Sequence, residues 1–151
     1  FNRESCQINI RGDEELTRPL LLGWGCAANQ IEGFLHWGWN YYLGYKKQNT
    51  SRQNPFEETS PHEFGDSTNI LPPGDTHVVY PGEHGSVWSS MRLEAQRQGL
   101  EDWELIRMLQ KKAPQKCKTI VSKVFRGFDD YTPDAALIGK LRGELLKELE
   151  K

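Results

Sequence analysis

This 151-residue chain has few cysteines, no excess of either charge and no long hydrophobic run. Its three cysteines, Cys6, Cys26 and Cys117, are widely spaced and form no Cys-x-x-Cys pair, so they indicate neither a disulfide framework nor a zinc site. Nineteen basic residues against 21 acidic ones give a formal charge of −2, and the basic residues are scattered. Nucleic acid and anionic membrane are therefore poor candidates for partners.

No apolar run approaches the ~18 residues of a membrane helix, and no secretory segment is present. The first residue is Phe1, so we expect the start to be a cut or processed end. The cellular compartment stays open, and a secreted or periplasmic parent protein is compatible with the sequence. His62, His77 and His84 lack metal-ligand spacing, so we expect no metal and no other cofactor.

Helical periodicity occurs near both ends of the chain. Residues 16–30 have apolar side chains at intervals of three and four, although Gly23 and Gly25 weaken the helix. Residues 132–134 supply an N-cap and a first-turn proline for a terminal helix. The apolar face predicted for that helix comprises Ile138, Leu141, Leu145 and Leu149.

A long central helix is predicted from an N-cap at Ser89 or Ser90 to about Lys112. Arg97 and Glu101 are spaced i, i+4 on it and can form an ion pair. Its predicted apolar stripe comprises Leu93, Leu100, Trp103, Ile106 and Leu109. A shorter apolar segment follows around residues 120–125.

Residues 31–40 and 77–80 are predicted as short strands, separated by a long polar loop at about 43–76. Helices alternating with strands favour an α/β fold with a parallel sheet. Two short strands cannot build such a sheet alone, so the missing strands are expected upstream of Phe1 or in another chain.

Residues 33–42 are the most informative stretch, because four of their last six side chains are aromatic and the stretch ends on polar groups. Aromatic rings offer flat apolar surface to the C–H face of a pyranose, while Asn and Tyr exchange hydrogen bonds with sugar hydroxyls. The alternative is a core strand. Strand alternation sends Leu35, Trp37 and Trp39 to one face and Phe34, His36, Gly38 and Asn40 to the other. His36 is expected to be a hydrogen-bonded core residue rather than an acid or base.

Several motifs follow one another in a distinctive order. They are Gly33-Phe34-Leu35 with Trp37 and Asn40, then Gly74-Asp75, then Tyr80-Pro81-Gly82, then the segment Ser90 to Glu104. In this order they resemble the C-terminal part of the glycoside hydrolase family 123 catalytic domain, and the resemblance covers about residues 18 to 110. The chain departs from the family pattern at Thr76, where Gly is usual, and at Trp103, where Tyr is usual.

The resemblance implies a (β/α)8 barrel, incomplete in this chain, and β-N-acetylgalactosaminidase activity in the parent protein. In that family the substrate's own acetamido oxygen attacks the anomeric carbon, oriented by an Asp, while the adjacent Glu is the general acid/base. The Asp-Glu pair belongs to an earlier barrel strand, and this chain has no counterpart of it. Residues 1–112 would thus be the last strands and helices of the barrel and residues 113–151 a helical extension, with no turnover of an aryl N-acetyl-β-galactosaminide expected from this chain alone.

The chain has four acidic doublets that could be considered for the role of that Asp-Glu pair. A general acid needs a partly desolvated position near the glycosidic oxygen, and adjacent helix residues project about 100° apart. We therefore expect each doublet to be solvated or salt-bridged. The doublets are Asp13-Glu14, Glu57-Glu58, Glu101-Asp102 and Asp129-Asp130.

Barrel active sites lie at the carboxyl ends of strands, which places the end of the aromatic segment where a ligand is expected. The predicted substrate-binding residues are Trp37, Trp39, Asn40 and Tyr42. Residues expected behind the pocket, or with a structural role only, are Tyr80, Arg92, Glu94 and Arg97. The expected ligand is an amino-sugar glycoside, and the expected protein contact is the missing part of the barrel or another copy.

A non-catalytic carbohydrate-binding or interaction module is the alternative function. Such a module should bind N-acetylgalactosamine unaided, whereas a barrel fragment should not. A third hypothesis is a structural remnant that completes its sheet with another chain, against which a clean monomer in sedimentation would argue.

Overall fold

The computed structural model divides the chain into two compact units. Unit 1 contains Glu15–Phe34 and Ala95–Lys151, and unit 2 contains Leu35–Glu94 together with Ile10–Glu14. The structure describes residues 11–12, 15–42, 54–57 and 71–151. Predictions for Cys6, the Asp13-Glu14 doublet, His62 and most of the long loop lie outside these residues.

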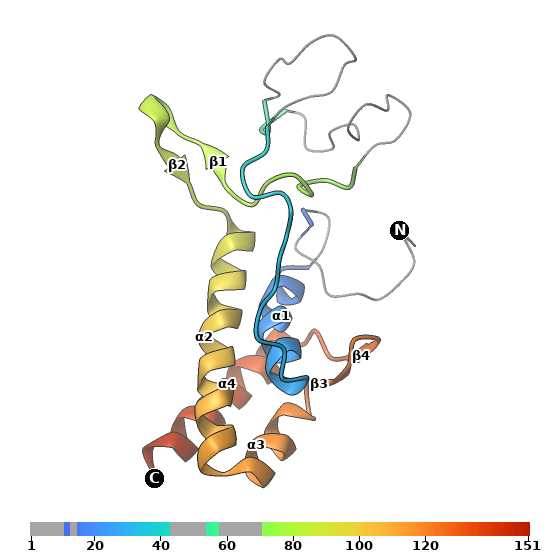
Figure 1. The fold of residues 1–151 in the computed structure, drawn as a ribbon, viewed down its shortest axis with the longest axis vertical. Coiled ribbons are helices and arrows are strands. Elements are labelled where there is room, and N and C mark those ends of the chain that lie inside the picture. The colour runs from blue at the N-terminus through green and yellow to red at the C-terminus, as the bar shows by residue number, and fades with distance from the viewer. Residues whose placement is uncertain (1–10, 13–14, 43–53, 58–70) are drawn as a thin grey trace. The chain divides into compact units, whose positions relative to one another are not determined.

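Helices make up most of unit 1, and unit 2 carries a β-hairpin and irregular segments (Figure 1). The predicted helix at 16–30 and the predicted long central helix are both confirmed. The elements are α1 (Thr17–Ala28), β1 (Tyr80–Pro81), the 3-10 helix η1 (Glu83–Gly85), β2 (Val87–Trp88), α2 (Met91–Lys112), α3 (Pro114–Val121), β3 (Phe125–Gly127), β4 (Asp130–Tyr131) and α4 (Ala135–Glu150).

Side-chain oxygens cap the two longest helices. The Ser90 hydroxyl accepts a hydrogen bond from the backbone N–H of Leu93 at 3.1 Å, so Ser90 is the N-cap of α2. Asp134 caps α4, since its Oδ1 accepts from the backbone N–H of Ala136 and Leu137. Pro133 therefore precedes the cap, and its predicted first-turn position is wrong. 

A single hydrophobic cluster joins α1, α2, α3, β3 and α4 in unit 1. The predicted face of α4 is confirmed, because Ile138, Leu141 and Leu145 are buried and Leu149 packs against the cluster. On α2 the stripe is only partly correct, because Leu100 is 43% exposed. The fully buried members of the cluster include Leu21, Trp24, Leu109, Val124 and Leu145.

Asp102 lies on the buried side of α2 and is 0% exposed. Its Oδ2 accepts a hydrogen bond from Trp24 Nε1 at 2.9 Å, and Arg142 Nη1 lies 3.1 Å from its Oδ1. Burial raises the pKa of Asp102, although the Trp24 hydrogen bond and the Arg142 charge oppose that shift. The neighbouring Glu101 is exposed and pairs with Arg97 and Arg142. The expected ion pairing of this doublet is thus confirmed, but its sequence did not indicate that one carboxylate is buried.

Helices α1 and α2 approach each other closely at two glycines. A Cβ atom at Gly23 would lie 1.8 Å from the backbone oxygen of Gly99, and one at Gly99 would lie 2.2 Å from the backbone oxygen of Leu20. The glycine that weakens α1 as an isolated helix therefore allows this helix contact.

The strand predictions need correction. Residues 31–39 form no strand, and Asn40 makes only an isolated antiparallel bridge to His77. The second predicted strand begins later than expected, at Tyr80, and pairs with β2 in a hairpin. Both sheets in the described residues are two-stranded and antiparallel, so the parallel sheet expected from the alternation of elements is absent from this part of the chain.

Candidate functional site

The aromatic segment runs beside residues 76–79 within unit 2. The backbone oxygen of Trp39 accepts from the N–H of Val78 at 2.9 Å, and the N–H of Tyr41 donates to the oxygen of Thr76 at 3.0 Å. Gly38 is buried, and a Cβ there would lie 2.6 Å from the backbone oxygen of Asp75. The close approach of the two segments therefore requires a glycine at position 38.

The rings of this segment are not core residues in the described structure. Leu35, Trp37 and Trp39 are 85%, 54% and 46% exposed, which excludes the core-strand alternative for these three side chains. The predicted alternation of faces is not observed, because residues 31–39 form no strand. Among the even-numbered residues Gly38 is buried, whereas Phe34 and Asn40 are exposed.

Trp37 is held in place by two neighbours although its ring is exposed. Its Nε1 donates to Asp75 Oδ2 at 3.0 Å, and the Tyr41 ring lies at a centroid distance of 5.6 Å and an angle of 58°. His36 Nε2 lies 2.8 Å from the backbone oxygen of Asp75. His36 is hydrogen-bonded as expected, but it is half-buried rather than a core residue. An exposed ring, a carboxylate and a second ring thus meet at one place.

Asp75 lies in a turn that Arg92 stabilises. The Arg92 side chain is buried and donates from Nη1 to the oxygen of Gly74 at 2.9 Å and from Nη2 to the oxygen of His77 at 2.7 Å. Gly74 has a φ of +71°, and a Cβ there would lie 2.5 Å from Arg92 Nη1. Arg92 thus holds the backbone on both sides of Asp75. Asp75 was absent from the predicted site residues, although the Gly74-Asp75 motif already marked it.

The other predicted site residues are less closely grouped. Asn40 is exposed, and the half-buried Tyr42 donates its hydroxyl to the oxygen of Val79 at 2.7 Å. Glu94 Oε1 accepts from the Ser89 hydroxyl at 2.6 Å at the start of α2. Arg97 is exposed and forms the expected ion pair with Glu101 within unit 1.

His77 is the buried polar centre of this unit. It is 2% exposed, its Nδ1 lies 3.0 Å from Thr76 Oγ1, and its Nε2 has no hydrogen-bond partner among the described residues. The rings of Tyr42 and Tyr80 lie against it at centroid distances of 5.9 and 5.1 Å. Burial, with a contribution from the charge of Arg92, lowers the pKa of His77 to about 4.

We expect the stability of unit 2 to fall on acidification because of His77. Unfolded His77 gains a proton below its usual pKa of 6.5, whereas the folded form resists protonation until about pH 4. The free energy of unfolding of unit 2 is therefore highest above pH 6.5 and falls as the pH drops from 6.5 towards 4. The loss from His77 should reach about 2 kcal/mol at pH 5. Thermal unfolding at pH 7 and pH 5, with His77→Phe compared with the exposed His84→Asn, measures this loss. Equal pH dependence in both variants would contradict it.

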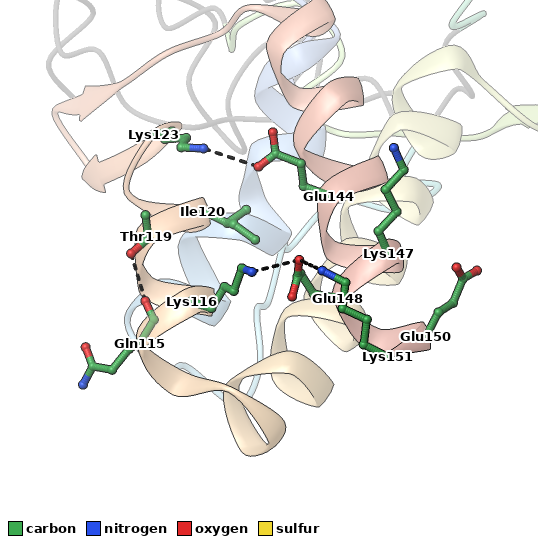
Figure 2. Close-up of a pocket in the computed structure, with 10 residues that line it drawn as sticks. All are labelled: Gln115, Lys116, Thr119, Ile120, Lys123, Glu144, Lys147, Glu148, Glu150 and Lys151. Carbon is green, nitrogen blue, oxygen red and sulfur yellow. Dashed lines mark hydrogen bonds and ion pairs between the residues drawn. The ribbon is translucent and has the colours of Figure 1, made fainter.

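A groove with a volume of about 780 Å³ lies between α3 and α4 of unit 1 (Figure 2). Its walls carry lysines and glutamates, and several of them form ion pairs. Lys123 binds Glu144 at 3.3 Å, and Glu148 binds Lys116 at 3.0 Å and Lys151 at 2.6 Å. Lysines and glutamates line the groove in nearly equal numbers, so neither sign of charge dominates it.

The described residues contain no group of three or more His, Cys, Asp or Glu side chains arranged to hold a metal ion. No helix among them is long and apolar enough to cross a membrane. Cys26 and Cys117 are buried free thiols whose pKa is raised by burial.

The described residues form a small protein of mixed helices and antiparallel hairpins, with exposed rings beside a carboxylate in unit 2. Residues 12–109 match the family described as glycoside hydrolase 123, catalytic domain. Because the match covers more than half of the chain, the chain belongs to this family, and the resemblance drawn from the motifs is confirmed. A comparison with curated proteins gives no match. The matched segment ends inside α2, so α3, the β3–β4 hairpin and α4 follow it.

Proposed function

We propose that this chain is the C-terminal portion of a (β/α)8 glycoside hydrolase barrel and contributes aromatic and polar walls to its sugar site. The proposed substrate is an N-acetyl-β-galactosaminide. The general acid/base Glu and its adjacent Asp come from an earlier strand in this proposal, so the chain alone is inactive. Residues 113–151, expected from sequence as a helical extension, form α3, the β3–β4 hairpin and α4 and extend the barrel in this proposal.

One observation carries the proposal: the exposed indole of Trp37 is fixed between the Asp75 carboxylate and the Tyr41 ring. A fixed indole offers a flat surface for the C–H face of a pyranose at little entropic cost. Asp75 uses Oδ2 for Trp37, and its other carboxylate oxygen provides an acceptor for a sugar hydroxyl. The same few residues thus supply both the apolar and the polar contacts that a sugar ring needs.

The neighbouring residues suit supporting roles in such a site. Asn40 is exposed beside Trp39 and offers an amide for sugar hydroxyls. Tyr42 donates its hydroxyl to Val79, and a hydroxyl group can donate and accept at the same time. Arg92 acts from behind the site by holding the Asp75 turn. Glu94 and Tyr80 have structural roles within unit 2 in this proposal, and Arg97 has a structural role within unit 1.

Titration with N-acetylgalactosamine, followed by NMR of the tryptophan indole N–H signals, tests the proposal. The sequence alone predicts that a barrel fragment does not bind the sugar unaided, but the fixed Trp37 ring changes that expectation to weak binding. A partial wall should hold the sugar with a dissociation constant of about 1 mM or above, which corresponds to about 4 kcal/mol of binding energy or less. We expect the Trp37 signal to shift and Trp37→Ala to abolish binding. Phe34→Ala is the matched control, because Phe34 is also about half exposed, at 47%.

The same titration distinguishes the competing functions. Saturation at micromolar sugar would favour the alternative, a self-sufficient carbohydrate-binding module. The absence of any Trp37 shift at about 100 mM sugar, far above the expected dissociation constant, would contradict a sugar site at this wall. Equal losses in Trp37→Ala and Phe34→Ala would also count against it.

A further inference from the structure

A second aromatic group lies on the hairpin of unit 2, and we call Phe56, Tyr80 and Trp88 the hairpin cluster. Phe56 stacks on Tyr80 with centroids 5.1 Å apart and planes at 28°, and it meets Trp88 edge-on at 5.9 Å. Tyr80 and Trp88 are cross-strand partners in the β1–β2 hairpin. Phe56 is nevertheless 53% exposed and Trp88 54% exposed. The cluster therefore presents aromatic surface to the outside.

Local structure keeps these rings in place. The N–H of Glu57 donates to the oxygen of Asn54 at 3.0 Å, and the N–H of Phe56 donates to Asn54 Oδ1 at 3.1 Å, which closes a turn around the buried Pro55. On the hairpin, a Cβ at Gly82 would lie 2.8 Å from Trp88 Nε1, so the indole packs directly on the glycine backbone. Rings held in this way lose little conformational entropy when a ligand stacks on them.

The hairpin cluster is linked to the proposed sugar site through the buried His77. The Tyr80 ring contacts His77, and His77 in turn contacts Tyr42. The carboxylates of Glu57 and Glu83 are exposed near the cluster in sequence and can accept hydrogen bonds from hydroxyls. A glycoside has a second moiety beyond the sugar whose bond is cleaved, so a member of this family needs a surface for it.

We propose that the hairpin cluster binds a second pyranose ring of a glycan whose first sugar lies at Trp37. This inference rests on the proposed function, because it assigns the neighbouring part of the same site. The second sugar stacks on the exposed rings of Phe56 and Trp88.

The test compares N-acetylgalactosamine with a disaccharide that carries a β-linked N-acetylgalactosaminyl group on a second hexose. We expect the disaccharide to bind about fivefold more tightly, equivalent to about 1 kcal/mol, through one added stacking contact. Trp88→Ala should remove this gain and leave monosaccharide binding unchanged, whereas Trp88→Phe should retain most of it. Val87→Ala, at a neighbouring position that is 62% exposed, is the matched control.

Separate indole N–H signals for Trp37 and Trp88 distinguish a failure of this inference from a failure of the proposed function. A shift at Trp37 without any disaccharide-dependent shift at Trp88 would overturn the second subsite and leave the first intact. A Trp88 shift with no Trp37 shift would support the hairpin subsite while contradicting the proposed first site. A Trp88 signal that changes only with protein concentration would overturn the inference and favour contact between two copies of the chain. Equal loss of monosaccharide and disaccharide binding in Trp88→Ala would also overturn it.

Discussion

Gly23→Ala should lower the free energy of unfolding by about 3 kcal/mol or prevent folding of unit 1. The added methyl group would lie 1.8 Å from the backbone oxygen of Gly99 and 2.3 Å from its carbonyl carbon. Backbone atoms in two helices cannot move aside as a flexible side chain can. Helices α1 and α2 would have to separate, which would open the cluster around Trp24 and Ile106.

Urea unfolding followed by circular dichroism measures this effect, and α4 offers a matched control. A Cβ at Gly139 has no heavy atom within 4 Å. Gly139→Ala should therefore raise the free energy of unfolding by about 0.5–1 kcal/mol, since alanine favours the helix. The two glycine-to-alanine substitutions should therefore change the free energy of unfolding in opposite directions. This difference distinguishes the effect of helix packing from that of helix propensity. A Gly23→Ala variant as stable as the parent chain would disprove the close contact.

Asp102→Ala should cost about 3 kcal/mol of folding stability. The substitution leaves Trp24 Nε1 without its acceptor inside the core, where Trp24 is 0% exposed. It also removes the 3.1 Å ion pair with Arg142. Asp102→Asn keeps an oxygen for the indole N–H and loses only the charge, so its cost should be about 1 kcal/mol.

Glu104→Ala is the control for Asp102. Glu104 is exposed and pairs with Arg107 on the surface of the same helix at 3.1 Å. Surface pairs of this kind contribute about 0–1 kcal/mol, so this variant should unfold close to the parent chain. Chemical denaturation of the three variants ranks them. Asp102→Ala and Glu104→Ala with the same stability would show that the buried carboxylate contributes no more than a surface one.

Local patterns predicted the helices well. The apolar spacing of α4 and that of α2 after Ser90 each lie within a few neighbouring residues, although the cap of α4 is Asp134 and not a residue before Pro133. These signals do not depend on the rest of the chain, because each helix satisfies its own backbone hydrogen bonds. Asp102 shows the limit of this approach, since the acceptor role that explains its burial depends on Trp24, 78 residues earlier.

The candidate site was predicted in part. Trp37 was named from its sequence, yet Asp75, which holds it, is 38 residues away and was named only as part of a motif. The expected strand at 31–40 was wrong because aromatic composition favours strands without supplying a partner strand. Residues 39–41 form backbone hydrogen bonds with residues 76–79 instead. The two segments can lie this close because Gly38 has no Cβ atom.

The sequence by itself determined the helices and the family, since capping residues, apolar periodicity and short motifs are local properties of the chain. Tertiary structure alone decided which aromatic rings are exposed, that the paired strands are antiparallel, and that Gly23 meets Gly99. These properties come from contacts between residues far apart in the chain. Their free energy depends on shape and burial, which no local pattern encodes.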